Sequence, residues 1–193
     1  NKLFLEVIIA NGFDNNAIKI LKTKKNLRLI DATNYVSGEL FKFVSFNKNI
    51  MVQSEDLNIF SKKNFKFVSK RKPTSKQLKD LIFAFNVCRY VKSNAIVLAS
   101  NETTVGIGSG QPSRLDSCQI AIDKMKKFNL STNNLVAASD AFFPFVDGIE
   151  KLIQTGVRAV VQPSGSIRDK EIIKFANETD TVLLFSRTRH FRH

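Results

Sequence analysis

A chain of 193 residues that is 43% hydrophobic is long enough to bury a core as one large domain or two small ones. It has no apolar run of membrane-spanning length and no signal-peptide pattern, and its two cysteines, Cys88 and Cys118, match no zinc motif and suit a reducing compartment, so we expect a cytoplasmic protein. The formal charge of +13 leaves three interpretations open: a nucleic-acid partner, a solvated lysine-rich surface, or anionic small substrates.

The first third of the chain predicts an α/β segment followed by hairpin strands. An apolar strand spans 3–10, a helix presents Ala17, Ile18 and Leu21 on one face, and a second strand spans 27–30. Between residues 39 and 68, apolar residues alternate and phenylalanine is frequent, which is typical of hairpins. The basic stretch 69–73 is the expected connector. Residues 1–72 therefore form the first predicted domain.

Residues 73–193 predict a three-layer α/β/α domain. Thr74 and Gln77 form a capping box at the start of a helix with an apolar stripe, and Asn101-Glu102 predicts a turn between two strands. Strands and helices then alternate with short loops. The expected strands are 95–99, 104–107, 135–138, 157–162 and 182–185. One helix is expected after Ser113, which would be its N-cap, with Asp116 three residues further on. Two more helices are expected over 148–155 and 169–177.

A glycine-rich stretch, 106–112, precedes the helix that carries Arg114 in its first turn. Glycines allow close backbone approach, amides at a helix start favour anions, and an arginine can bind a phosphate or carboxylate. The spacing is not that of a dinucleotide-binding loop, because the third glycine comes one residue too early. A plain tight turn is the alternative.

The loop 139–147 holds three phenylalanines and a proline between Asp140 and Asp147. Aromatic faces beside carboxylates suit a flat heterocycle, held by stacking and by hydrogen bonds to its ring nitrogens. The alternative is that the phenylalanines fill the core and that Asp147 caps the next helix.

The loop 162–169 and the tail 185–193 also follow predicted strands, and the tail holds both histidines of the chain. In a parallel sheet such segments converge on one edge, where ligands bind. A solvated basic tail is the alternative. His190 and His193 have no carboxylate or cysteine at metal-ligand spacing, and the zinc-deaminase, Walker and nucleophile-elbow motifs are absent, so a zinc hydrolase is excluded.

Taken together, these segments closely resemble the C-terminal part of the AICAR (aminoimidazole-carboxamide ribonucleotide) formyltransferase domain of the bifunctional purine-biosynthesis proteins. The resemblance covers essentially the whole chain in the right order. The matching blocks are Phe4-Leu5-Glu6-Val7-Ile8-Ile9-Ala10, 24–29, 91–95, 105–114, 139–145, 162–169 and 189–193.

The resemblance implies a fold similar to cytidine deaminase without its zinc, and formyl transfer from 10-formyltetrahydrofolate to the 5-amino group of AICAR. It implies the following site residues: Asn94, Arg114, Phe142 and Arg189 on the AICAR nucleotide, with Arg189 at its phosphate; Leu115, Asp147, Ser166 and Ile167 on the folate; and a catalytic His193 close to the reacting groups. It further implies small-molecule substrates, a homodimer with shared sites and no nucleic-acid or membrane partner, and it allows a monovalent cation such as potassium.

Two departures from the family pattern bear on activity. The catalytic Lys-His pair and the cyclohydrolase domain lie in earlier segments that this chain lacks, so we expect the chain to be part of a longer polypeptide and inactive alone. Val146 stands where the family usually has arginine, and Asn11 where it usually has proline. A basic nucleic-acid-binding module and an inactive scaffold that retains the fold are the alternatives.

Overall fold

The computed structural model describes residues 4–35, 41–128 and 134–192. Contacts divide the chain into two compact units, unit 1 (residues 1–55) and unit 2 (residues 56–193). The predicted division at 72/73, which rests on the basic stretch 69–73, stays a prediction.

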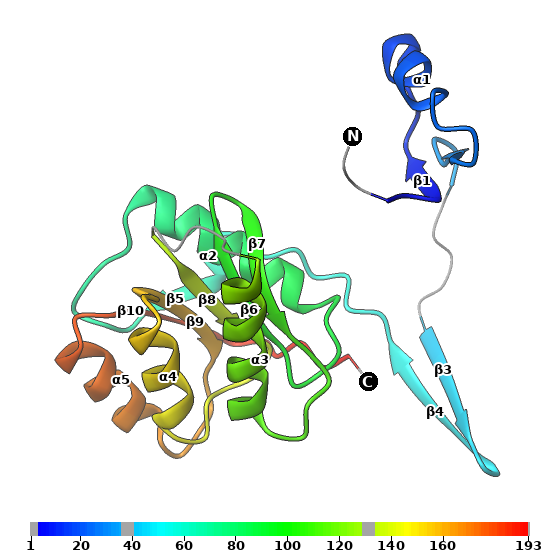
Figure 1. Cartoon of the computed structure of the whole chain (residues 1–193). Coiled ribbons are helices and arrows are strands. Elements are labelled where there is room, and N and C mark those ends of the chain that lie inside the picture. The colour runs from blue at the N-terminus through cyan, green and yellow to red at the C-terminus, as the bar shows by residue number, and fades with distance from the viewer. Residues whose placement is uncertain (1–3, 36–40, 129–133, 193) are drawn as a thin grey trace. The chain divides into compact units, whose positions relative to one another are not determined.

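The described residues of unit 1 form two small sheets and one helix (Figure 1). Strands β1 (Val7–Ala10) and β2 (Arg28–Asp31) pair in parallel and are joined by α1 (Asn15–Leu21). Strands β3 (Phe41–Phe46) and β4 (Asn49–Ser54) form an antiparallel hairpin. The predicted strand–helix–strand order and the predicted hairpin are confirmed, although β1 spans Val7–Ala10 and not the predicted range 3–10.

A six-stranded mixed sheet forms the centre of unit 2, with the order β5-β10-β9-β8-β6-β7. Its strands are β5 (Phe65–Phe67), β6 (Ile96–Ser100), β7 (Thr103–Gly108), β8 (Val136–Ser139), β9 (Ala159–Pro163) and β10 (Val182–Ser186). Strands β8, β9 and β10 are parallel, β6 runs against β8, and β7 runs against β6. Therefore β7 points the same way as β8 to β10, and the carboxyl ends of four strands meet at one edge.

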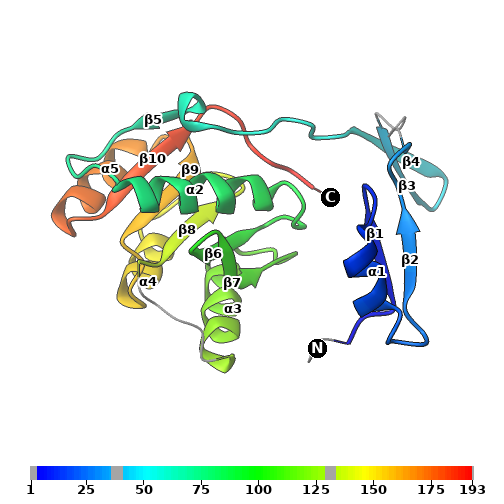
Figure 2. The same cartoon turned by 90° about the horizontal axis from the view of Figure 1, so that it is seen from above.

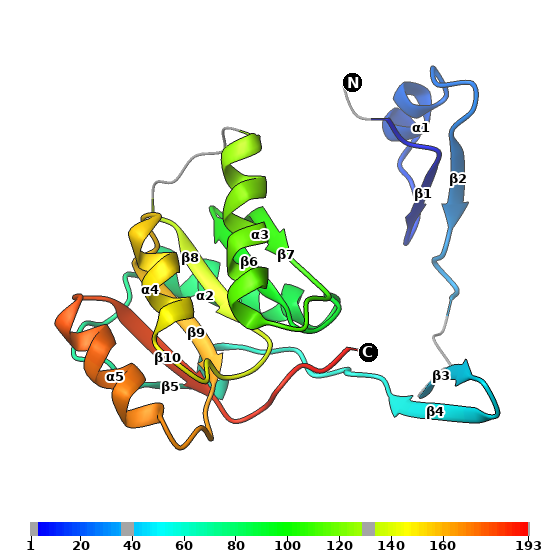
Figure 3. The ribbon, with the colours of Figure 1, turned by 60° about the horizontal axis from the view of Figure 1, so that its bottom comes forward.

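Helices cover both faces of this sheet. Helix α2 (Ser75–Cys88) lies on one face (Figure 2), and α3 (Arg114–Lys127), α4 (Asp147–Gln154) and α5 (Asp169–Glu178) lie side by side on the other (Figure 3). A short 3-10 helix, η1 (Lys62–Asn64), precedes β5. The predicted three-layer α/β/α architecture is confirmed.

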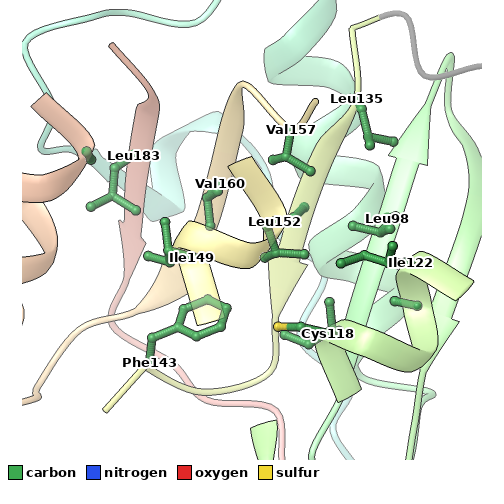
Figure 4. Close-up of a cluster of buried hydrophobic side chains, with 14 of the residues drawn as sticks. Leu98, Cys118, Ile122, Leu135, Phe143, Ile149, Leu152, Val157, Val160 and Leu183 are labelled. Carbon is green, nitrogen blue, oxygen red and sulfur yellow. The ribbon is translucent and has the colours of Figure 1, made fainter. Parts of the chain in front are cut away.

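Two apolar clusters fill the spaces between these layers. Between the sheet and α3 to α5, Leu98, Ile122, Phe143 and Ile149 pack together (Figure 4), and on the α2 side Leu81 and Phe85 pack against sheet residues. Because every residue of β6, β8, β9 and β10 is buried, these strands read as continuous apolar runs rather than alternating ones.

Local signals set the ends of α2 and of the β6–β7 hairpin. The capping box is present, since Thr74 Oγ1 accepts from the Gln77 amide at 3.2 Å and Gln77 Oε1 accepts from the Thr74 amide at 3.0 Å. Asn101 and Glu102 both have positive φ, which closes a tight hairpin as predicted. Ser113 is the N-cap residue of α3, as predicted, but its side chain makes no capping hydrogen bond.

Gly106 and Gly108 lie within β7 and not in a loop, which corrects the expected glycine-rich turn. A Cβ atom on either residue would collide with backbone of α3, with the carbonyl group of Ala121 or of Ser117. The missing side chains therefore let α3 pack closely on β7. The close approach that these two glycines allow is to a helix, not to a ligand.

The predicted connector 69–73 is tied to the sheet. Ser69 is buried, and its Oγ accepts from the backbone amide of Leu183 at 2.8 Å. Phe60 and Phe65 also belong to the core on the α2 side. These contacts explain why the compact units divide at Glu55/Asp56, before the connector.

Candidate functional site

The strand directions bring four chain segments to one edge of the sheet. The segments after β7, β8, β9 and β10 all start at carboxyl ends there, and the antiparallel strand β6 begins at the same edge, just after Asn94. Asn94 is held by the segment after β7, because its Nδ2 donates to the carbonyl oxygens of Gln111 and Pro112 at 2.8 and 2.9 Å. The predicted convergence is confirmed.

Arg114 lies in the first turn of α3 and reaches back to the loop after β8. Its Nε donates to Ser139 Oγ at 2.9 Å, and its Nη2 pairs with Asp140 Oδ1 at 2.7 Å. The Arg114 side chain is 10% exposed and that of Asp140 is fully buried. Within the described ranges, the Nη1 nitrogen of Arg114 has no hydrogen-bond acceptor, so this nitrogen is available to donate to a ligand.

A cavity of about 430 Å³ opens beside this pair. Its lining includes four residues of the predicted site, namely Asn94, Arg114, Leu115 and Asp147, together with Phe143 and Phe145 from the aromatic loop. One cation, one carboxylate and two aromatic rings thus surround one space, which is a combination suited to a flat, polar ligand. Gly148 also lines it, and a Cβ there would collide with the Phe143 ring.

Phe142 and Arg189 meet each other outside the lining of this cavity. The Arg189 guanidinium carbon lies 4.6 Å from the centre of the Phe142 ring, a cation–π contact. The Arg189 Nη2 also lies 3.7 Å from where a Gly165 Cβ would stand, so the arginine lies over the loop after β9. The His190 amide donates to the Asp140 carbonyl at 2.9 Å, which ties the tail to the loop that holds Phe142.

The residues predicted on the folate side are only partly brought together. Asp147 lines the cavity, and its Oδ1 accepts from the amide of Gly148 at 2.7 Å. It is the first residue of α4 and Val146 is the N-cap, so the alternative of an Asp147 cap is wrong. Ser166 and Ile167 lie in the loop after β9, where the Ser166 hydroxyl accepts from the Arg168 amide at 3.1 Å and the Ile167 side chain is exposed.

In the aromatic loop 139–147, one phenylalanine fills the core and two others remain accessible to a ligand, so each of the two interpretations of its sequence holds for some of its residues. Phe143 is buried in the core, its amide donates to Gln162 Oε1 at 3.3 Å, and this residue does fill space beneath the site. Phe142 is half-buried under Arg189, and Phe145 is half-exposed, with the Arg168 guanidinium 4.6 Å from its ring centre. Two of the three rings are therefore open to a ligand.

His190 is a buried anchor that sequence reasoning missed. Its Nδ1 bonds Asp56 Oδ2, and its ring packs on Phe85 and Phe60, with ring centres 4.5 and 5.0 Å away. The solvated-tail alternative is therefore wrong for this residue, which is 1% exposed. The position of the imidazole directly after Arg189 was the only sequence signal. His193, the predicted catalytic histidine, lies outside the described residues.

Both cysteines lie near the site but are buried. Burial raises the pKa of the Cys88 thiol well above its ordinary value, and the charge of Asp140 adds to this; burial also raises the pKa of Cys118 to about 12. Such thiols stay protonated and unreactive at neutral pH. Over the described ranges, no group of His, Cys, Asp or Glu could hold a metal ion, and no helix there is long and apolar enough to cross a membrane.

Comparison with known proteins assigns the chain to a family. Residues 1–124 match the family described as "AICARFT/IMPCHase bienzyme". The chain belongs to this family. Its relatives include the bifunctional purine biosynthesis protein PurH of Buchnera aphidicola (45% identical), of Persephonella marina (44%) and of Chlorobium phaeobacteroides strain BS1 (41%).

Each of these alignments covers 100% of this chain and 37% of the relative. This member of the AICARFT/IMPCHase family therefore spans little more than a third of the curated PurH proteins that it matches. The matches place the chain within a bifunctional purine-biosynthesis family.

Proposed function

We propose that this chain forms the nucleotide- and folate-binding part of an AICAR formyltransferase, which transfers the formyl group of 10-formyltetrahydrofolate to the 5-amino group of AICAR during IMP synthesis. One observation supports this above all. Asn94, Arg114, Leu115 and Asp147, which come from three separate segments, line a single cavity of about 430 Å³. Family membership supplies the reaction class, and the cavity supplies a place for it.

On the nucleotide side, the proposed contacts are polar and cationic. AICAR carries a phosphate and a carboxamide, and guanidinium groups bind such oxygens through charge-assisted hydrogen bonds. Arg189 is exposed above Phe142 and can turn toward a phosphate, while Arg114 has its Nη1 free and Asn94 lines the same cavity. Phe142 would offer its ring to the flat imidazole.

On the folate side, the proposed contacts are a carboxylate and apolar side chains. The Asp147 carboxylate can accept hydrogen bonds from the N–H groups of a pterin, and Leu115 lines the same cavity. Ser166 and Ile167, on the neighbouring loop after β9, would extend this surface. Val146, in the position before Asp147, is partly buried and packs against the core beneath this surface.

The reaction requires two partners to be aligned and one proton to be removed. The AICAR amine forms a bond to the formyl carbon, the bond from that carbon to the folate nitrogen breaks, and the proton from the amine ends on tetrahydrofolate. Because this amine is a weak nucleophile, positioning and general base action carry the rate. We assign His193 to the vicinity of the reacting groups and assign the main acid–base pair to an upstream Lys-His segment, so the chain contributes part of a site.

The proposal extends to the assembly, as a homodimer with sites shared between subunits. Analytical ultracentrifugation of the 193-residue chain and of a version with the upstream segment tests this, and dimer formation is expected for the longer version. A monovalent cation such as potassium is tested by comparing formyl transfer in potassium and in choline salts.

Calorimetric titration of the chain with AICAR tests the nucleotide assignment. We expect Arg189→Ala to weaken binding by about 2–4 kcal/mol, as for loss of a desolvated charged contact. Arg187→Ala is the matched control, because Arg187 is an exposed arginine of the same tail that does not contact Phe142. Equal affinities of the two variants would refute the role of Arg189, and absence of AICAR binding both by the unmodified chain and by the version with the upstream segment would refute the proposal.

Two further measurements separate the alternatives. Tight, steeply salt-dependent binding of a labelled duplex, without binding of AICAR, would favour the nucleic-acid module that the charge of +13 suggests. Formyl transfer measured with and without the upstream segment distinguishes an enzyme part from an inactive scaffold, and recovery of activity with the segment is expected.

A further inference from the structure

Asp140 is a fully buried carboxylate beside the proposed nucleotide site, and both of its oxygens are engaged. Oδ1 accepts from Arg114 Nη2 at 2.7 Å, and Oδ2 accepts from Ser93 Oγ at 2.6 Å. The side chain has no exposed surface. It therefore has no route to a ligand of its own, and its effect on a ligand must pass through the groups that it holds.

The backbone of Asp140 joins two more segments to the same point. Its amide donates to the carbonyl of Ala95 at 3.2 Å, and its carbonyl accepts from the amide of His190 at 2.9 Å. One residue thus links the segment of Asn94, the start of α3 and the segment of Arg189. Phe142 lies two positions after Asp140 in the same loop. Each residue proposed to contact the nucleotide is therefore either bonded to Asp140 or close in sequence to Asp140 or to one of its bonding partners; these residues are Asn94, Arg114, Phe142 and Arg189.

The contact with Arg114 also determines which guanidinium nitrogen remains available. Nε is taken by Ser139 Oγ, and that hydroxyl donates its own proton to the Ala141 carbonyl at 2.7 Å, which turns a lone pair toward the arginine. Nη2 is taken by Asp140. The planar guanidinium is then fixed by two of its three nitrogens, and Nη1 is left to donate to a ligand in the cavity that Arg114 lines.

We infer that Asp140 is a positioning residue of the nucleotide site, whose carboxylate orients the Arg114 guanidinium so that Nη1 is the nitrogen offered to a ligand. This inference rests on the proposed function. An uncompensated guanidinium at this depth would be unfavourable, so the pair also removes other orientations of Arg114. The carboxylate itself touches no substrate.

A double-mutant cycle on the 193-residue chain tests this role, with AICAR affinity measured by calorimetry. We expect Asp140→Ala to weaken AICAR binding about tenfold or more, and Asp140→Asn, which keeps an acceptor for Arg114, to recover most of the loss. In a chain that already carries Arg114→Ala, either change should alter the affinity less than about twofold. A purely structural aspartate would instead weaken binding equally in both backgrounds.

Asp80 provides a matched control, because it is also a buried aspartate that accepts two hydrogen bonds. It accepts from the amides of Asn101 and Glu102 at 3.1 and 2.6 Å, at the end of β6 that is opposite to Asn94. Asp80→Asn should lower stability and leave AICAR affinity unchanged. Asp80→Ala should likewise leave the affinity unchanged, and a loss of affinity equal to that of Asp140→Ala would overturn the inference.

The NMR signal of the Arg114 Nε–H group keeps the test decisive if Asp140→Ala does not fold. It should exchange slowly in the unmodified chain and in Asp140→Asn, which keeps the acceptor, and at least about tenfold faster in Asp140→Leu, a side chain of similar size without one; an unchanged exchange rate in Asp140→Leu would refute the positioning role. Failure of the unmodified chain to bind AICAR would count against the proposed function. Normal binding by the unmodified chain with no effect of the Asp140 variants would count against Asp140 alone.

Discussion

Units 1 and 2 use similar apolar sequence to very different effect. In unit 2 the central strands and the inner faces of α2 to α5 are buried, whereas no described residue of unit 1 is buried. On the β3–β4 hairpin the side chains of Phe43, Phe46 and Ile50 are 70, 56 and 67% exposed. Phenylalanines in one unit fill a core, and those in the other contact solvent.

Alternation of apolar residues is therefore enough to form a hairpin, but it does not by itself bury the apolar side chains of that hairpin. A two-stranded sheet has no second layer of its own and is marginally stable in water. Unit 1 is held largely by short-range bonds, such as those from Thr33 to Asp31, which lower the pKa of that carboxyl. In unit 2, β5 and β10 pair across more than a hundred residues, and the candidate site is built on that long-range framework.

The largest expected contrast comes from removing one phenylalanine ring from each unit. Phe85→Ala should lower the free energy of unfolding of unit 2 by about 3–5 kcal/mol, because it empties a fully buried position. Phe43→Ala, at an exposed position of the hairpin, should change stability by less than about 0.5 kcal/mol. Hydrogen exchange measured at increasing denaturant concentration gives the change in the free energy of unfolding for each variant. Equal decreases for the two variants would refute the contrast.

A smaller contrast is expected from adding one methyl group to a glycine of each unit. Gly108→Ala should cost about 3 kcal/mol, because its Cβ would collide with the Ser117 carbonyl of α3. Gly12→Ala meets only the Thr33 hydroxyl, at 3.3 Å, and should cost about 1 kcal/mol through its positive φ. Exchange rates of α3 amides should rise only for the first variant; a rise for the second would show that the units are coupled.

The smallest expected effect is the dependence of unit 2 on alkaline pH. Burial raises the pKa of Cys118 from its ordinary value of 9.0 to about 12. Between these values the folded state holds a proton that the unfolded state has released, so this contribution is fully present below pH 9 and is lost as pH rises toward 12. We expect a loss of about 1 kcal/mol between pH 9 and pH 10, measured by thermal unfolding.

Cys118→Ala is the control for this pH dependence. The variant should show a flatter fall of stability over the same range, whatever its absolute stability at neutral pH. Because both cysteines of the chain lie in unit 2, thiol modification at pH 8 reports the opening of that unit alone. An identical pH slope in the variant would show that Cys118 does not titrate as its burial requires.

The elements of unit 2 and part of the site could be predicted from the sequence because their signals are local. The capping box of Thr74 and Gln77, the turn at Asn101 and Glu102, and the regular alternation of strands and helices depend on residues a few positions apart. Matching of blocks to a family then selected Asn94, Arg114, Leu115 and Asp147, and the structure places these four around one cavity.

Pairs of distant residues could not be predicted in this way. Arg114 meets Asp140 across 26 positions, and His190 meets Asp56 across 134. Gly106 and Gly108 were predicted to lie in a ligand-binding loop, because the sequence alone does not distinguish a glycine in a strand that packs under a helix from a glycine in a turn. Nothing in the residues near Asp140 indicates that both of its oxygens would be occupied.

Short patterns of side-chain chemistry were enough to predict most helices and strands and the family to which the chain belongs. They could not predict which apolar residues are buried, where the two units divide, or that a buried aspartate connects the segments of the site. Burial and charge pairing depend on which layers lie against one another, and that is a property of the folded chain rather than of any short stretch of it.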